Sequence, residues 1–204
     1  MPINNIEIML TNFGDWLLIF PLSTIILIYL FFTKQYYLLK KWATMVVMCI
    51  TTVVIAKLFF ISCGCIILNG IVHSPSGHAA LSFVFYISLS IIIWRSNGYF
   101  AGITSLIIAL FIVMSVSVTR VTLHYHSVLE ALIGICIGCL WLIIFIRQTR
   151  GRALNNFSSY IPLLCIFYIL FQIIAQSSQR ISHEGLLHLI GRQIQIYLDI
   201  CSTN

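Results

Sequence analysis

The chain contains few charged residues. Only 8% of its 204 residues are charged, 60% are hydrophobic, and the mean hydropathy is +1.05. A soluble domain carries about 25% charged residues, so this composition excludes an ordinary soluble domain. Several apolar runs reach the roughly 20 residues that cross a bilayer, and because they do not alternate with polar residues they argue against the strands of a membrane barrel.

The sequence also lacks the patterns of a signal peptide, a nucleic-acid-binding surface, a zinc site and a second domain. The first apolar run lacks both a basic segment and a small-residue cleavage site, so we interpret it as a retained helix and not as a signal peptide. The net charge is +6, but the basic residues are scattered, which argues against nucleic-acid binding. Cys63 and Cys65 have no second pair to complete a zinc pattern, so we expect neither a metal nor a cofactor. Without internal repeats or a low-complexity linker, residues 1–204 are predicted to form one domain.

The apolar runs predict an all-α fold, a polytopic membrane helix bundle. Six spanning helices are expected at about residues 15–32, 42–68, 75–94, 100–119, 126–146 and 159–175. In the tail, residues 180–204, apolar side chains recur at helical spacing with charged ones between them, which favours an amphipathic helix at the membrane surface. A loosely ordered tail is the alternative.

The basic residues of the short loops predict the orientation in the membrane. One side of the predicted bundle has most of them, Lys34, Lys40, Lys41, Arg95, Arg147, Arg150 and Arg152, and the other side has mainly Arg120, Arg180 and Arg192. Since basic loops stay in the cytoplasm, the second side should lie outside it.

A short segment, Ser74 to His78, forms the start of the third predicted helix. Ser74 can cap that helix, and Pro75 suits its first turn, where a missing N–H costs nothing. The N–H groups of Ser76, Gly77 and His78 would then point outward at the positive end of the helix and could bind an anion. An ordinary helix-starting turn is the alternative for the residues before the histidine, and His78 adds a group that transfers protons.

His126 and Glu130 are four residues apart and so share one face of the fifth predicted helix. The carboxylate can hold one ring N–H, which leaves the other nitrogen with its lone pair, as in a nucleophile with its orienting group. A structural pair that closes the helix end is the alternative. Arg120, at the end of the fourth helix, can bind phosphate oxygens through two N–H groups or simply extend to water.

Lys57 is flanked by apolar residues within the second predicted helix. A lysine at membrane depth is expensive and marks a functional position, where it could reach a phosphate or pair with Glu130. His73 and His124 could also bind substrate, although a loop role is favoured for both. Because these histidines lie at loop ends and not at facing depths, a haem site is disfavoured.

Together these residues resemble the type 2 phosphatidic acid phosphatase superfamily of membrane lipid phosphatases. The family signature Pro-Ser-Gly-His is intact at residues 75–78. The signature Ser-Arg-x5-His-x3-Asp is present at residues 119–130, with Thr for Ser and Glu for Asp. The signature Lys-x6-Arg-Pro keeps Lys57 but has Gly64 in place of its arginine, and the whole resemblance covers residues 57–138.

The resemblance implies a two-step mechanism without a metal. His126 would attack phosphorus, Glu130 would orient His126, and His78 would protonate the leaving oxygen and then activate water. A second set of residues would hold the phosphate oxygens: Arg120, Lys57, Ser76, Gly77 and Thr119. His73 and His124 are auxiliary candidates.

The expected function is hydrolysis of a lipid phosphomonoester or diphosphate at the outer face of a bacterial cytoplasmic membrane. The expected partners are the lipid phosphate and the bilayer. Alternatives are a lipid phosphotransferase with the same phosphohistidine, a catalytically inactive scaffold that binds lipid phosphate, and a transporter with Lys57 and Glu130 on an ion path. The transporter is disfavoured because no proline- or glycine-broken pair of helices marks a midplane site.

Overall fold

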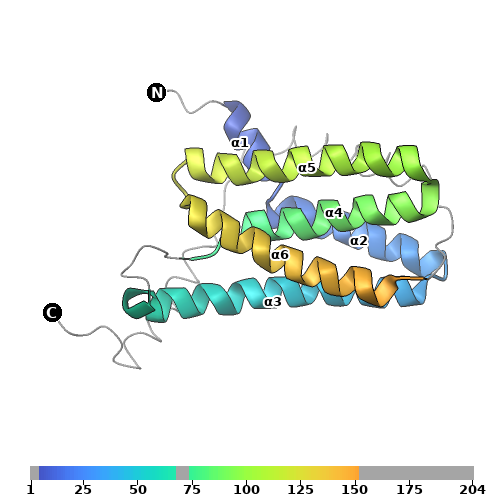
Figure 1. Cartoon of the computed structure of the whole chain (residues 1–204), viewed down its shortest axis with the longest axis horizontal. Helices are drawn as coiled ribbons and strands as arrows, with labels where there is room; N and C mark the ends of the chain where they lie inside the picture. The colour runs from blue at the N-terminus through green and yellow to red at the C-terminus, as the bar shows by residue number, and fades with distance from the viewer. Residues whose placement is uncertain (1–4, 68–73, 152–204) are drawn as a thin grey trace.

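The computed structural model describes residues 5–67 and 74–151, and in these ranges all regular structure is helical (Figure 1). The helices follow one another as α1 (Asn5–Asn12), α2 (Trp16–Phe32), α3 (Tyr36–Ile67), α4 (Gly77–Asn97), α5 (Tyr99–Thr122) and α6 (Val128–Thr149). This architecture confirms the predicted all-helical membrane bundle. The predicted span at 159–175 and the predicted tail helix lie outside the described residues.

The helices are suited to a bilayer, where every backbone N–H and C=O must be satisfied within its own segment. Four of the described helices, α3 to α6, are long and apolar enough to cross a membrane. Helices α1 and α2 meet at a bend of 41° and make a fifth span if they are counted as one. The chain is therefore an integral membrane protein.

The start of α3 and the existence of α1 differ most from the sequence pattern. A loop is predicted up to residue 41, but α3 begins at Tyr36 and contains Lys40 and Lys41 in its first turns. Lysine has a high helix propensity, and its long side chain can extend past the membrane edge. Two lysines therefore do not end a helix that emerges from the bilayer. Helix α1 has only eight residues, too few for a periodic pattern to predict it.

Helix α4 lies at the centre and packs against α2, α3, α5 and α6 (Figure 1). Its contact with α6 is close because two α6 glycines face α4. A Cβ atom at Gly138 would lie 2.9 Å from the Ala80 carbonyl oxygen, and one at Gly134 would overlap the Ser76 carbonyl oxygen. Small residues of this kind let membrane helices approach backbone to backbone.

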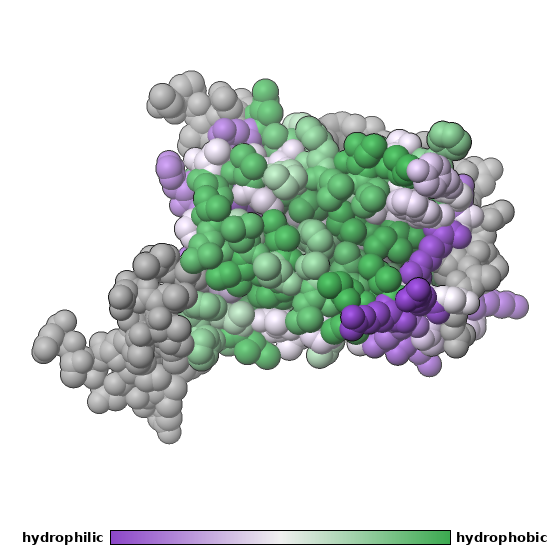
Figure 2. All heavy atoms as spheres, viewed as in Figure 1, coloured by the Kyte–Doolittle hydropathy of each residue, from purple (hydrophilic) through white to green (hydrophobic). Residues whose placement is uncertain are grey.

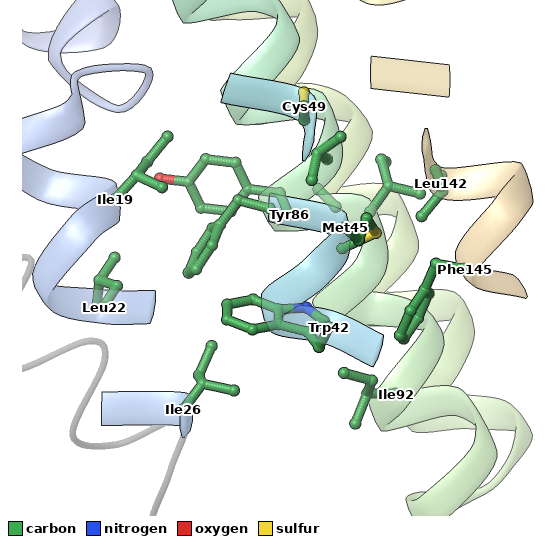
Figure 3. Packing of buried hydrophobic residues seen from close by; sticks show 14 of the residues in the cluster. Ile19, Leu22, Ile26, Trp42, Met45, Cys49, Tyr86, Ile92, Leu142 and Phe145 are labelled. Atoms are coloured by element: carbon green, nitrogen blue, oxygen red, sulfur yellow. The ribbon is translucent and has the colours of Figure 1, made fainter. Parts of the chain in front are cut away.

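Large side chains fill the other side of the core. Trp42 of α3 is fully buried, donates from Nε1 to Ser88 Oγ at 2.9 Å, and meets the Phe85 ring edge-on at 6.0 Å. Figure 3 shows Trp42 between Ile26 of α2 and Phe145 of α6. These contacts fix α3 and α6 relative to α4, and all three helices contribute to the site described below.

The two ends of the bundle have different residues. At one end, which we call the basic end, α2 passes to α3, α4 passes to α5, and α6 finishes (Figure 1). Its basic side chains are Lys34, Lys40, Lys41, Arg95, Arg147 and Arg150. Figure 2 shows hydrophilic side chains gathered there beside a hydrophobic belt over the middle. The opposite end, the site end, has the start of α4 and the turn from α5 to α6.

Candidate functional site

The segment before α4 differs from its expected form by two residues. Ser76, and not Ser74, is the N-cap of α4, and its hydroxyl oxygen accepts the Ala79 N–H at 3.4 Å. The physical reason is that Glu130 holds the preceding backbone extended. The Ser74 N–H donates to Glu130 Oε1 at 3.1 Å, and the Ser76 N–H donates to the Glu130 carbonyl at 3.0 Å.

This cap changes which backbone groups can bind an anion. The Ser76 N–H, an expected phosphate ligand, is already bonded to the Glu130 carbonyl. Gly77 and His78 occupy the first two helical positions, where the N–H groups have no acceptor within the helix. Of the three amides predicted to bind an anion, those of Gly77 and His78 therefore remain as candidates.

The turn between α5 and α6 is closed by two hydrogen bonds of the Schellman type. The His124 N–H donates to the Val121 carbonyl at 3.0 Å, and the Tyr125 N–H donates to the Arg120 carbonyl at 3.1 Å. His124 itself has a φ of 57°, the left-handed conformation that glycine usually takes at this position. The turn also brings the His126 N–H onto the Arg120 carbonyl at 3.1 Å, so Arg120 and His126 are joined through the backbone.

The Glu130 carboxylate connects this turn with the start of α4. It accepts hydrogen bonds from His126 Nδ1 at 2.9 Å, from the Ser127 N–H at 3.0 Å and from the Ser74 N–H at 3.1 Å. With Ser127, whose hydroxyl accepts the Glu130 N–H, it forms a capping box at the start of α6. Glu130 thus has both of the roles considered from the sequence: it pairs with His126, and it closes the start of α6.

His126 is held in the form that a nucleophile requires. Because an ionised carboxylate only accepts, Nδ1 bears the proton and Nε2 keeps its lone pair. His126 is 8% exposed, and its Nε2 has no hydrogen-bond partner among the residues the structure describes. A buried polar atom of this kind is rare in proteins and calls for a functional explanation.

The charges around His126 favour its neutral form. Burial lowers the pKa of His126 from its ordinary value of 6.5, and the positive charges of Arg120 and Lys57 act in the same direction. The hydrogen bond and the charge of Glu130 act against them, but the net shift of the pKa is downward. These charges therefore favour the neutral imidazole, which keeps the lone pair on Nε2.

Two buried cations complete the site. Lys57 of α3 and Arg120 of α5 are both buried, and both act electrostatically on His78 of α4, as does His126. A Cβ atom at Gly77 would lie 3.9 Å from Lys57 Cε, so the lysine reaches the first turn of α4. In the described part of the chain, Glu130 is the one buried carboxylate at this site, so the site has an excess of positive charge that an anion would compensate.

The remaining predicted site residues have different positions. Thr119 is buried and its hydroxyl donates to the Ser115 and Val116 carbonyls, at 2.8 and 2.9 Å, so its hydrogen is used within α5. His124 has the backbone role described above. His73 lies outside the described residues. The structure thus brings together His78, Arg120, His126 and Glu130 with Lys57.

Some residues of the site were not predicted from the sequence. The ring of Tyr125 lies over the Arg120 guanidinium, with 4.5 Å between Arg120 Cζ and the ring centroid. A Cβ atom at Gly14, in the turn between α1 and α2, would lie 3.0 Å from His78 Cβ. Ser127 was not predicted either, although its spacing from Glu130 is that of a capping box and could have indicated its role.

The fold and the site define an integral membrane helix bundle with a buried, positively charged histidine site at one end. The PAP2 superfamily model matches residues 68–154, a range that includes His78, Arg120, His126 and Glu130 but begins after Lys57. The match is consistent with a member of the type 2 phosphatidic acid phosphatase superfamily and confirms the resemblance predicted from the motifs. Members of that superfamily are phosphoesterases, which supports a phosphatase activity in general. No curated protein and no solved structure matches the chain.

Proposed function

We propose that this protein hydrolyses a lipid phosphate through a phosphohistidine on His126. The observation that carries the proposal is the buried Nε2 atom of His126, which has a lone pair and no partner among the described residues. Glu130 holds the other ring nitrogen, and the cations Arg120 and Lys57 lie nearby. This combination supports an attack on a phosphorus atom whose oxygens carry negative charge.

The reaction has two steps. In the first, the lone pair of His126 Nε2 forms a bond to phosphorus, the bond from phosphorus to the lipid oxygen breaks, and protonated His78 gives that oxygen a proton. In the second, His78 takes a proton from water, the water oxygen attacks phosphorus, and the bond from phosphorus to Nε2 breaks, releasing phosphate. Arg120, Lys57 and the Gly77 and His78 amides hold the phosphate oxygens, and this electrostatic positioning is the main source of phosphoryl-transfer catalysis.

The position of the site is compatible with a lipid substrate at the face of the membrane away from the cytoplasm. The site lies at one end of the spanning helices, where a lipid head group would be. Six basic residues are at the opposite end, and basic residues favour the cytoplasmic side. Either a phosphomonoester or a diphosphate lipid fits this chemistry.

The test is phosphate release by the purified protein in mixed micelles that contain lipid monophosphates or prenyl diphosphates, with and without a chelator. We expect release that continues with chelator and that His126→Ala reduces by at least about a thousandfold. His124→Gly is the matched control, because it changes a histidine of the same turn whose role is in the backbone. An acid-labile, base-stable phosphoenzyme should form in the wild type and not in His126→Ala.

No release by a folded wild-type protein would contradict the hydrolase. If a second lipid then accepts the phosphoryl group in a reaction that needs His126, the protein is a phosphotransferase. If neither water nor lipid accepts it, the site only binds lipid phosphate.

A further inference from the structure

We propose that Tyr125 is a positioning residue for phosphate binding, because its ring holds the guanidinium plane of Arg120. This inference rests on the proposed function only in that Arg120 binds a phosphate-like anion. The direct observation is the distance of 4.5 Å between Arg120 Cζ and the Tyr125 ring centroid. At this distance the cation is attracted by the negative face of the ring.

The backbone makes the contact possible. Tyr125 follows His124, whose left-handed φ of 57° reverses the chain at the end of α5. The Tyr125 N–H donates to the Arg120 carbonyl at 3.1 Å, so the two residues are joined by the backbone as well as by their side chains. The ring is thereby directed back over the last turn of α5.

Burial indicates that Tyr125 does not serve the hydrophobic core. Tyr125 as a whole residue is 48% exposed, whereas Arg120 beneath it is only 6% exposed. One face of the ring covers the guanidinium and the rest of the ring is open. Tyr125 is not part of the hydrophobic core cluster, so the contact with Arg120 is the side-chain packing that the structure shows for it.

The geometry suits anion binding. The N–H groups of a guanidinium lie in its plane and point outward from its edge, where they can bind two oxygens of one phosphate. A ring that lies over the guanidinium does not occupy this edge, and the contact limits movement of the Arg120 side chain. Removing the ring should therefore weaken phosphate binding through Arg120, although Tyr125 itself does not contact the phosphate.

The experiment measures binding of orthovanadate, a phosphate-like anion, to the purified protein in detergent, together with KM and kcat for a lipid phosphate. Tyr125→Leu should weaken vanadate binding by about three- to tenfold and raise KM more than it lowers kcat. Tyr125→Phe and Tyr125→Trp keep a ring and should bind vanadate within about twofold of the wild type or more tightly. If Tyr125→Leu does not fold, the Phe and Trp variants still test the proposal, since weakening in both would overturn it.

Tyr99→Leu is the matched control. Tyr99 is at the other end of α5, is 63% exposed and contacts the Trp94 ring edge-on at 5.8 Å. Its replacement removes another contact of an exposed tyrosine ring, at the end of α5 far from Arg120. Vanadate binding should be unchanged in this variant, and a loss equal to that of Tyr125→Leu would overturn the proposal.

The remaining outcomes separate this inference from the proposed function. If the wild type binds vanadate in a Tyr125-dependent way but hydrolyses no lipid phosphate, the proposed function fails and the role of Tyr125 stands. If hydrolysis occurs and Tyr125→Leu binds vanadate as the wild type does, the role of Tyr125 is wrong. A wild type that binds no vanadate at all overturns the inference, and a Phe variant as weak as Leu would assign the effect to the hydroxyl instead.

Discussion

The site end and the basic end both contain arginines, but the burial and the contacts of these arginines differ. Arg120 at the site end is buried beside Lys57, and the Tyr125 ring covers its guanidinium. Arg95 at the basic end is only partly buried and donates to the Thr149 hydroxyl and carbonyl at 2.8 and 3.2 Å. The basic end pairs its arginine with oxygens of Thr149, whereas the site end places two buried cations beside one buried carboxylate, a charge balance that suits an anionic substrate.

The carboxylate of Glu130 should be the group whose loss has the largest effect. Glu130→Ala removes the acceptor of three N–H groups, those of Ser74, His126 Nδ1 and Ser127. We expect the free energy of unfolding in detergent to fall by about 3 kcal/mol and phosphate release to fall by at least about a thousandfold. Thermal unfolding and phosphate release measure the two effects.

The basic end has a matched variant for that comparison. Thr149→Val removes the side-chain acceptor of Arg95 but leaves the Thr149 carbonyl in place. It should reduce the free energy of unfolding by about 1 kcal/mol and leave phosphate release within about twofold of the wild type. Equal losses of activity in the two variants would show that the ends do not differ in function.

Substitutions at two glycines of α6 should separate an effect on activity from an effect on stability. A Cβ atom at Gly134 would press on the Ser76 carbonyl at the start of α4, so Gly134→Ala should displace the turn that we propose to bind phosphate. We expect phosphate release to fall by about ten- to a hundredfold, because small misplacements of catalytic groups have effects of this size. Steady-state kinetics with one lipid phosphate would measure it.

Gly138→Ala provides the control, since its Cβ atom would meet the Ala80 carbonyl at 2.9 Å, one turn further from the site. Both variants should lose about 1–3 kcal/mol of unfolding free energy, but Gly138→Ala should keep its activity within about threefold. Similar activity losses in both would point to general disruption of the helix contact.

The pH dependence should reflect the lowered pKa of His126. Because burial and the nearby cations lower it below 6.5, the nucleophile stays neutral as the pH falls to that value. The acidic limb of kcat/KM should therefore lie below pH 6.5. In the unfolded chain the same imidazole binds its proton near pH 6.5, so its contribution to stability is present above that pH and is lost as the pH falls below it.

His126→Ala tests the sign of this effect. Relative to the wild type, the variant should lose less unfolding free energy between pH 7 and pH 5, since it has no buried imidazole to protonate. A wild type whose stability rises relative to the variant on acidification would contradict the lowered pKa.

The smallest effect concerns a backbone feature that the two ends share. His124 and Lys34 have φ values of 57° and 59°, and each follows the C-cap of a helix. Glycine takes this conformation without a steric penalty, so His124→Gly and Lys34→Gly should each stabilise the protein by about 0.5 kcal/mol. Phosphate release should stay within about twofold in both, and a large loss in His124→Gly alone would assign His124 to the substrate site.

Much of the fold could be predicted from the sequence because the bilayer restricts the choices. Apolar runs of spanning length must be helical in lipid, and the described helices α2 to α6 follow the predicted runs. Their ends were less predictable, as at Tyr36, because charged residues can continue a helix beyond the membrane. The pairing of His126 with Glu130 was also accessible, since residues four apart meet on one helix face.

The rest of the site depends on contacts that no local pattern determines. The Ser74 N–H reaches Glu130 across 56 residues of sequence, and this contact makes Ser76 the cap of α4. Tyr125 covers Arg120 because His124 adopts the left-handed conformation. Glycine is usual at such a position, so a histidine there does not indicate a turn in the sequence.

The sequence by itself determined the helical membrane architecture, the placement of both motifs at one end of the bundle, and the kinds of side chain there. These features follow from hydropathy and from spacing along single helices. Only the tertiary structure decided which N–H groups Glu130 accepts, that Lys57 reaches the first turn of α4, and that Gly134 must have no side chain. The physical reason is that such contacts depend on how closely α3, α4 and α6 pack, and a single helix contains no information about that distance.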